Sequence, residues 1–393
     1  MNPESPALPA HHSVVLLIDD QRIICEAVKR MLLTEPDIEF HYTCDPSQAL
    51  ALARQLCPTL ILQDLVMPDT DGLDLVRAFR ADADTAQVPL IVLSSKEEAV
   101  VKAEAFRAGA NDYLVKLPDR IELIARIRYH CKAYIALLER NEAFAALEKS
   151  QRTLAAELAE AAAYVRSLLP PPLERPGLAT AWEFLPSSSL GGDAFGYFDI
   201  DAEHFAVFLL DVCGHGVGSA LLSVSAMNAL MGQSLPTVDF REPAAVLVAL
   251  NGLFPMEKHN NLYFTLWYGV AHLPSRTLRY ASAGHPPAVL LGGTEPGLLR
   301  CRAMPIGTWP EARFETGAAS LPDEARLYLF SDGLYEINGP DGAAVEFEAF
   351  VRVLAEPEGR PGRKIAEVVA AMRAWQGRED FDDDVSLLEV RIA

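Results

Sequence analysis

The first third of the chain alternates short, wholly apolar runs with longer segments whose apolar residues recur at helical spacing. The apolar runs predict strands buried on both faces: Val14–Ile18, Leu60–Leu62, Leu90–Leu93 and Tyr113–Val115. Segments between them, such as Ile23–Leu33 and Asp45–Gln55, show helical periodicity. This order predicts an α/β domain over residues 13–128, with a parallel sheet covered by helices on both faces.

Residues 129–169 contain no glycine or proline and are rich in Ala, Leu, Glu and Arg, which predicts one long helix. Two sets of residues recur every seven positions: Leu137, Phe144, Gln151, Leu158 and Val165, and Ala133, Arg140, Leu147, Leu154, Ala161 and Leu168. Two such sets, offset by three or four positions, are typical of a coiled-coil seam. Pro170-Pro171-Pro172 is expected to end the helix. Two interpretations stay open: a helix packed on its own domain, or a parallel coiled coil that makes the protein a homodimer.

From residue 170 to 393, many short apolar segments are separated by Gly, Pro and Asp. The predicted strands are Phe205–Leu210, Tyr263–Val270, Leu278–Ala281, Ala288–Leu291, Leu327–Phe330 and Val385–Val390. The predicted helices are Ser219–Met231, Pro243–Leu253 and Arg363–Trp375. Strands with inserted helices predict a layered α+β domain, and we expect a β-sandwich flanked by helices.

Composition narrows the possible functions. The net charge is −20 and no basic run stands out, which argues against binding to nucleic acid or an anionic membrane. The six cysteines show no zinc-ligand spacing, so we expect reduced thiols. Residues 1–12 are polar and rich in proline, which predicts a disordered tail rather than a signal peptide. No apolar run reaches the roughly 18 residues of a membrane-spanning helix, so we expect a cytoplasmic protein.

Polar residues follow the apolar runs of the first domain where each strand ends. Asp19 and Asp20 follow the first run, Asp64 follows the next, and Ser94 and Lys116 end the last two. The carboxyl ends of parallel strands meet at one edge of a sheet, so these side chains should cluster there. Three clustered carboxylates repel one another and favour a hard cation such as Mg²⁺. A hydroxyl and an ammonium group nearby can hold phosphoryl oxygens, with the central Asp64 as the nucleophile that forms an acyl phosphate.

These residues and their spacing resemble the receiver domain of two-component response regulators, and Lys116 follows Asp64 by 52 residues. The resemblance implies a doubly wound, five-stranded parallel sheet and phosphorylation of Asp64 by a histidine kinase. It also implies Mg²⁺ held by Asp19, Asp20, Asp64 and the Val66 carbonyl, and a switch made of Ser94, Tyr113 and Lys116. Leu117 departs from the family, which has proline directly after the lysine, so we expect a differently shaped loop there.

The second half carries five separated motifs: Gly191-Gly192-Asp193, Asp211-Val212-Cys213-Gly214-His215-Gly216, Ala283-Gly284-His285-Pro286-Pro287, Phe330-Ser331-Asp332-Gly333 and Asp382-Asp383-Asp384-Val385-Ser386. Four of the five place aspartate beside an expected strand end. Convergent carboxylates without Cys or repeated His ligands suit Mg²⁺ or Mn²⁺ rather than zinc. Two such ions sharing one carboxylate can activate a water and offset charge on a phosphoryl group. Each motif alone is also typical of a turn, so the inference depends on the ordered set.

The ordered set resembles the SpoIIE-like branch of the metal-dependent protein phosphatases, which are related to protein phosphatase 2C, from about residue 164 onward. The resemblance implies a serine/threonine protein phosphatase with two Mn²⁺ or Mg²⁺ ions, acting on a phosphorylated anti-sigma-factor antagonist. The residues that match its catalytic metal ligands are Asp193, Asp211, the Val212 carbonyl, Asp332 and Asp383. Asp384 matches the adjacent acid, and no general acid can be assigned.

Together the two halves predict a response regulator in which phosphorylation of Asp64 activates the phosphatase by rearranging the 129–169 helix. One alternative is a non-enzymatic adaptor that binds a partner on a phosphatase fold; the four retained carboxylates argue against it. Another is a diguanylate cyclase, because Gly191-Gly192-Asp193-Ala194-Phe195 resembles its signature. The cyclase needs Glu where Ala194 stands, and it would leave Asp211 and Asp332 unexplained.

Overall fold

The computed structural model describes residues 11–68, 70–187, 190–340, 342–357 and 364–393. The chain divides into two compact units, residues 1–153 and residues 154–393. The disordered tail predicted for residues 1–12 lies outside the described residues for its first ten positions.

The first unit contains a five-stranded parallel sheet with the strand order β2-β1-β3-β6-β7. Its strands are β1 (Ser13–Ile18), β2 (Ile38–Thr43), β3 (Leu60–Asp64), β6 (Leu90–Ser94) and β7 (Asp112–Val115), with a small hairpin of β4 (Val66–Met67) and β5 (Thr70–Asp71). Its helices are α1 (Arg22–Leu32), a 3₁₀ turn (Pro46–Gln48), α2 (Ala49–Leu56), α3 (Gly72–Ala81), α4 (Ala99–Ala108) and the start of α5 (Arg120–Ser167). The predicted fold of this unit is confirmed.

Both faces of this sheet are apolar because helices cover both. Val15 and Leu17 of β1 pack with residues of α1 and α5, including Val28. Leu16 and Ile18 of the same strand point the other way and pack with residues of α2, α3 and α4. The apolar runs of the sequence are therefore the strands enclosed between two helical layers.

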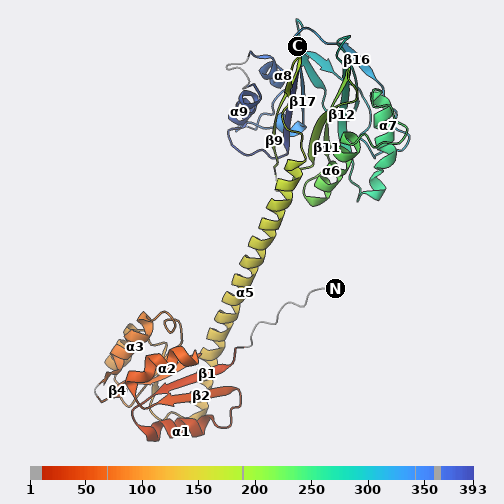
Figure 1. Cartoon of the computed structure of the whole chain (residues 1–393). Coiled ribbons are helices and arrows are strands. Elements are labelled where there is room, and N and C mark those ends of the chain that lie inside the picture. The colour runs from red at the N-terminus through yellow and green to blue at the C-terminus, as the bar shows by residue number, and fades with distance from the viewer. Residues whose placement is uncertain (1–10, 69, 188–189, 341, 358–363) are drawn as a thin grey trace. The chain divides into compact units, whose positions relative to one another are not determined.

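Helix α5 runs without interruption from Arg120 to Ser167 and joins the two units (Figure 1). The linker helix expected from residue 129 is thus continuous with the last helix of the first unit. Leu123 and Ile127 near its start are buried in the first core, whereas Phe144, Leu147 and Leu154 further along are more than half exposed. The helix ends before Pro170, as predicted. Within the described parts of the chain, no helix has the length and apolar character needed to cross a membrane.

The second unit contains two antiparallel sheets with the orders β10-β11-β12-β13-β16 and β15-β14-β17-β18-β9-β8. The strands are β8 (Glu174–Arg175), β9 (Leu178–Leu185), β10 (Asp193–Asp199), β11 (His204–Val212), β12 (Phe264–His272), β13 (Thr277–Ala283), β14 (Ala288–Leu291), β15 (Gly297–Leu299), β16 (Gly317–Ser320), β17 (Ala325–Phe330) and β18 (Val385–Ile392). The helices are α6 (Val217–Met231), α7 (Pro243–Leu253), α8 (Phe347–Ala355) and α9 (Lys364–Gln376), with 3₁₀ turns at Met256–Lys258 and Asp332–Leu334.

The two sheets pack face to face and helices cover their outer faces, so the predicted β-sandwich is confirmed. Leu327 and Leu329 of β17 point into the core shared by both sheets. Tyr328 and Phe330, the alternate residues of that strand, pack beneath α8 and α9. Helices α6 and α7 lie on the opposite side of the sandwich (Figure 1). This two-layer arrangement brings strand ends from both sheets close to one another.

Candidate functional site

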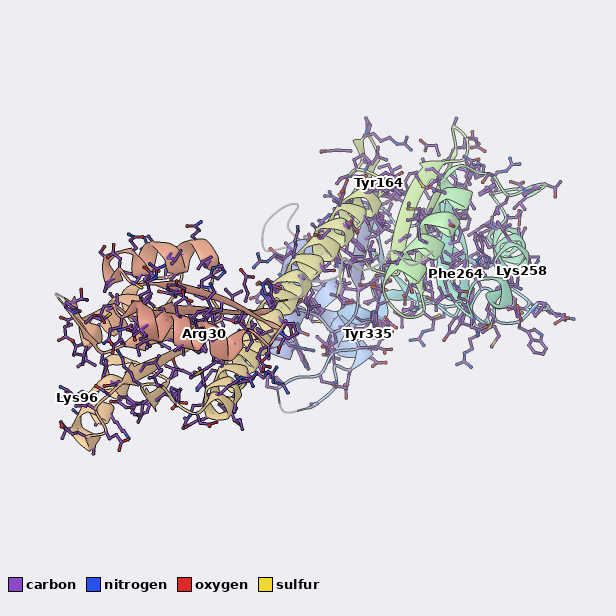
Figure 2. All side chains as sticks on the ribbon, turned by 90° about the horizontal axis from the view of Figure 1, so that it is seen from below. Arg30, Lys96, Tyr164, Lys258, Phe264 and Tyr335 are labelled. Carbon is purple, nitrogen blue, oxygen red and sulfur yellow. The ribbon has the colours of Figure 1, made fainter. Side chains whose placement is uncertain are left out.

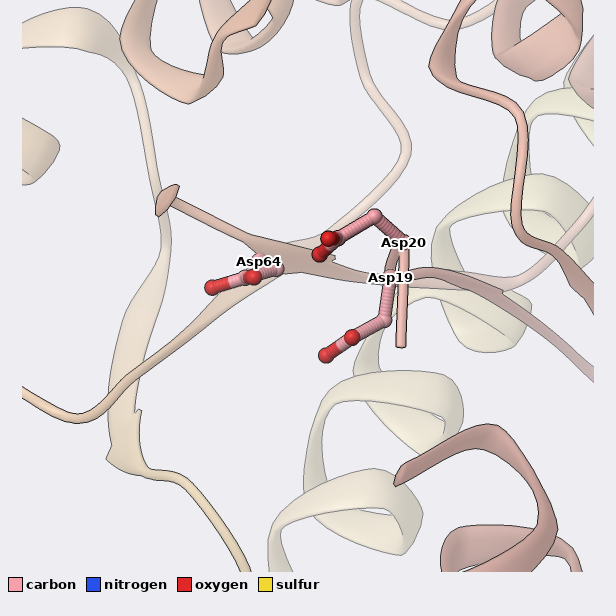
Figure 3. Close-up of side chains that lie close together, drawn as sticks. All are labelled: Asp19, Asp20 and Asp64. Carbon is pink, nitrogen blue, oxygen red and sulfur yellow. The ribbon is translucent and has the colours of Figure 1, made fainter. Parts of the chain in front are cut away.

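Three acids of the first unit meet at the carboxyl edge of its parallel sheet. The pairing of Ile18 with Gln63 aligns β1 and β3, so the residues that follow, Asp19 and Asp64, are neighbours. Asp19, Asp20 and Asp64 each offer an oxygen within 4.8 Å of the others. Figure 3 shows their carboxyl groups projecting toward the same region. The cluster predicted from the strand ends is therefore present.

The charges in this cluster are only partly balanced by the protein. The Lys116 ammonium lies 2.6 Å from Asp64 Oδ2 and 3.1 Å from Asp19 Oδ2, and the Val66 amide donates to Asp64 Oδ1 over 3.1 Å. Burial raises the pKa of the Asp19 carboxyl, and the buried Oδ1 of Asp20 has no hydrogen-bond partner. Oxygen ligands at this spacing, with an unpartnered carboxylate oxygen among them, fit a hard divalent cation such as Mg²⁺.

The residues predicted to form the switch lie beside this cluster. The buried Ser94 hydroxyl accepts a hydrogen bond from the Lys96 amide over 3.2 Å. The hydroxyl of Tyr113, which is also buried, donates to the Lys96 carbonyl over 2.5 Å, so both residues contact one segment (Lys96 is labelled in Figure 2). Leu117, the departure from the family pattern, has a left-handed φ of 51° and an exposed side chain.

In the second unit, acids from both sheets lie at neighbouring strand ends. Asp193 begins β10 and pairs directly with Asp211 near the end of β11. Asp332 follows β17 and begins a 3₁₀ turn, and Asp383 comes just before β18. Both oxygens of the buried Asp193 carboxylate lack hydrogen-bond partners. A buried, unpartnered carboxylate requires either a proton or a cation.

The ionisation of these acids shows that they form one electrostatic cluster. Burial, followed by the charges of Asp332, Asp383 and Asp384, raises the pKa of Asp211 to about 7. Burial, and then the charges of Asp211 and Asp384, raises the pKa of Asp193 well above its usual range. Burial also raises the pKa of Asp332, with Glu336 and Asp383 adding to the effect. Bound divalent cations would favour the ionised forms.

The spacing of these acids differs from that in the first unit. Among the described residues, only Asp19, Asp20 and Asp64 bring three acidic, His or Cys ligand atoms within 4.8 Å of one another. A more open cluster suits two ions that share a central acid better than one ion held by every acid. Gly192 keeps the predicted carbonyl ligand open, because a Cβ on Gly192 would lie 2.7 Å from the Val212 oxygen. The donor set thus fits a pair of hard cations.

Sequence analysis missed the role of His285. Its Nδ1 lies 2.8 Å from the hydroxyl of Thr265, and Thr265 is the direct partner of Asp211 on β12. Burial lowers the pKa of His285 to about 3, partly offset by the Phe330 carbonyl just before Ser331-Asp332. This neutral histidine is therefore hydrogen-bonded to the strand beside Asp211. The Ala-Gly-His motif was the available signal, but the partner on β12 could not be read from it.

Asp384 was predicted only as the acid next to a metal ligand. In the structure its carboxylate is hydrogen-bonded by other parts of the chain. Its carboxylate accepts hydrogen bonds from the amides of Ser187 and Gly192 and from the Ser187 hydroxyl. These groups precede Asp193 in the sequence by one to six positions. The acid therefore contacts the loop leading to Asp193.

Comparisons with known proteins agree with the two-unit organisation. The family model for stage II sporulation protein E (SpoIIE) matches residues 201–393, and the response regulator receiver domain model matches residues 15–128. The phosphoserine phosphatase RsbP of Bacillus subtilis (strain 168) is 31% identical over 156 residues, 38% of each chain. The DNA-binding response regulator MtrA of Mycolicibacterium smegmatis is 35% identical over 128 residues, 33% of this chain and 51% of MtrA.

A solved structure is similar to the second unit in fold. The SiaA-PP2C domain of Pseudomonas aeruginosa gives a TM-score of 0.54 at 22% identity, covering 62% of this chain and 99% of that domain. At this identity the likeness concerns the fold alone. The chain spans 38% of RsbP and 51% of MtrA, so similarity to these curated relatives is confined to parts of them.

Proposed function

Because the chain joins a response regulator receiver domain to a phosphatase domain of the SpoIIE type, we propose that it is a protein serine/threonine phosphatase controlled by phosphorylation of Asp64. The observation that carries this proposal is the electrostatic cluster of Asp193, Asp211, Asp332 and Asp383, drawn from both sheets of the sandwich. An adaptor that only binds a partner has no need for the raised pKa values of Asp193, Asp211 and Asp332, because ionised acids in such surroundings cost stability.

Two Mn²⁺ or Mg²⁺ ions are the cofactors we assign to this site. Asp211 would be shared by both ions and the Val212 carbonyl would be a further ligand, with Asp193 on one ion and Asp332 and Asp383 on the other. When bound, such ions activate a water and offset charge on the phosphoryl group. The chain's own contribution is to hold the acids at fixed strand ends, with Gly192 leaving the Val212 oxygen accessible.

The receiver site supplies the proposed control. Asp64 would accept a phosphoryl group from a histidine kinase, with Mg²⁺ held by Asp19, Asp20, Asp64 and the Val66 carbonyl. Lys116 already contacts Asp64 and Asp19 and is positioned to contact a phosphoryl oxygen. Ser94 and Tyr113 both form hydrogen bonds with the backbone of Lys96. If phosphorylation of Asp64 moves the Ser94 hydroxyl toward it, the hydrogen bond between Tyr113 and the Lys96 carbonyl would change as well.

Control can reach the phosphatase site through the end of α5. Leu169, just past the helix, is buried in the sandwich core. The Tyr197 hydroxyl donates to the Pro171 carbonyl over 2.6 Å, and the Trp182 indole donates to the Pro170 carbonyl over 3.0 Å. Tyr197 lies on β10, the strand that begins with Asp193. A shift of the helix end would therefore act on the strand that carries a proposed metal ligand.

The exposed seam of α5 supports a homodimer as part of this proposal. Phe144, Leu147 and Leu154, all members of the two seven-residue repeats, are 68%, 56% and 57% exposed. An apolar seam with heptad spacing is buried when two such helices pair. Pairing of two chains would let phosphorylation change the packing of the helix as well as its position.

Phosphoserine or phosphothreonine on an anti-sigma-factor antagonist is the substrate we propose, supported by the partial likeness to the phosphoserine phosphatase RsbP. The test is release of phosphate from such a phosphoprotein by the purified chain with Mn²⁺, compared with Asp211→Asn. Metal-dependent release lost in the variant supports the enzyme. Tight binding of the phosphoprotein without phosphate release would favour the adaptor instead.

A further inference from the structure

Asp384 lies between two segments of the phosphatase site and is buried. One carboxylate oxygen, Oδ1, accepts from the Ser187 amide over 2.8 Å and from the Ser187 hydroxyl over 3.1 Å. The other, Oδ2, accepts from the Gly192 amide over 2.6 Å. Both oxygens are thus engaged by the loop that leads into Asp193, through the short, charge-assisted type of hydrogen bond.

The closeness of this contact requires glycine at position 191. A Cβ on Gly191 would lie 2.7 Å from Asp384 Oδ2, which is closer than real Cβ atoms approach. The Gly216 amide also donates to the Leu190 carbonyl over 3.2 Å, so the loop contacts the motif that contains Asp211 as well. Gly191 therefore allows the chain to approach the Asp384 carboxylate, and Gly192 allows it to pass close to the Val212 carbonyl.

The backbone of Asp384 is hydrogen-bonded to Ser331, which lies in a different segment from Ser187 and Gly192. The Ser331 hydroxyl donates to the Asp384 carbonyl over 3.1 Å, and the Ser386 amide donates to the Ser331 hydroxyl over 2.9 Å. Ser331 immediately precedes Asp332. Asp384 therefore links the segment carrying Asp332 and Asp383 to the loop carrying Asp193, which come from different sheets.

We propose that Asp384 is a positioning residue that holds Ser187 and Gly192, and with Gly192 the adjoining Asp193, in the geometry that receives a metal ion. In this proposal Asp384 is not itself a metal ligand: its two oxygens accept three hydrogen bonds from the chain. The expected effect on turnover rests on the proposed phosphatase function, whereas the positioning of Ser187 and Gly192 by Asp384 does not.

Hydrogen exchange of single amides in the metal-free full chain tests the hold directly. In Asp384→Ala, exchange at both the Ser187 and the Gly192 amide should rise at least about tenfold, as loss of a hydrogen bond to a charged group predicts. In Asp384→Asn, the remaining oxygen can still serve Ser187, but the NH₂ group cannot accept from Gly192, so Gly192 alone should rise. The control is Asp382→Asn, which changes an exposed acid that pairs with Arg378 and should leave both amides protected.

Mn²⁺ titration of turnover separates a positioning residue from a ligand. Asp384→Ala should need at least about tenfold more Mn²⁺ for half-maximal turnover, yet recover to within about threefold of the unaltered chain at saturating Mn²⁺. Asp383→Ala should stay inactive throughout. Unchanged exchange at both amides in Asp384→Ala would overturn the proposal, as would turnover that saturating Mn²⁺ does not restore. If the unaltered chain shows no turnover, the proposed function fails, and the exchange result still decides whether Asp384 holds the loop.

Discussion

Asp193 and Asp211 are direct partners on the antiparallel strands β10 and β11, which places two acids side by side at one edge of the sandwich. Thr265 continues the row on β12, and His285 contacts Thr265. Asp332 and Asp383 approach from the other sheet. Like charges held this close destabilise the metal-free protein, so the arrangement is best understood as a preformed cation site.

Replacing Asp211 by Asn should have opposite effects on activity and on stability. Metal-dependent turnover should fall at least about a thousandfold, because the acid shared by both proposed ions is lost. The metal-free second unit should become more stable above pH 7, where Asp211 is ionised in the unaltered chain at a cost of about 1.4 kcal/mol per unit of pKa shift. The gain should shrink as pH falls from 7 toward 4, because the carboxyl then becomes protonated in the folded state.

Urea unfolding, monitored by tryptophan fluorescence, measures this gain in the stability of the second unit alone. All four tryptophans, at positions 182, 267, 309 and 375, belong to the second unit. The exposed Asp382→Asn change serves as the control for removing one negative charge. An Asp211→Asn protein that is less stable than the unaltered chain at pH 8 without metal would show that the acids are not in mutual repulsion.

His285 should make the second unit sensitive to acid. The unfolded histidine takes up a proton near pH 6.5, whereas the folded residue stays neutral until about pH 3. Stability is therefore lost as pH falls through this window, by about 1.4 kcal/mol per pH unit. His285→Gln removes this pH dependence. We expect the variant to be less stable than the unaltered chain at pH 7.5, and the difference in stability to disappear as the pH falls from 6.5 to 4.5. A difference that stays constant with pH would mean that His285 is not held neutral.

The seam of α5 should pair two copies of the chain. Leu147→Lys combined with Leu154→Lys should raise the dissociation constant of the dimer at least about a hundredfold, because two apolar contacts in the seam are lost. Thr153→Lys combined with Ala156→Lys adds the same two charges at exposed positions outside both repeats and should have little effect. Light scattering over a concentration series measures the change. A monomeric unaltered chain, or a dimer indifferent to the double change, would exclude pairing through this seam.

Much of the fold followed from the sequence because its apolar runs are enclosed between layers. Four strands of the first unit, β1, β3, β6 and β7, and six of the strands described in the second coincide with predicted runs. The edge strand β2 was not predicted, since only Ile38 of its six residues is buried. The strand β10 was missed because Asp193 and Gly196 interrupt its apolar character. Neither strand carries the continuous apolar run that identified its neighbours.

Only the site residues that lie in local sequence motifs could be predicted from the sequence. Asp19, Asp64 and Lys116 could be grouped because parallel strands place their carboxyl ends at one edge. The contact of Asp384 with Ser187 spans 197 positions, and that of His285 with Thr265 depends on the register of β12. Such long-range pairings are set by packing of the whole sandwich and leave no local pattern.

Control of the phosphatase through Asp64 is tested most directly by hydrolysis of p-nitrophenyl phosphate. The full chain is assayed with Mn²⁺, with and without beryllofluoride as a mimic of the acyl phosphate. We expect metal-dependent turnover that beryllofluoride raises several-fold in the unaltered chain and leaves unchanged in Asp64→Ala. Turnover that beryllofluoride lowers or leaves unchanged in the unaltered chain would contradict activation through Asp64, and so would an equal rise in the variant.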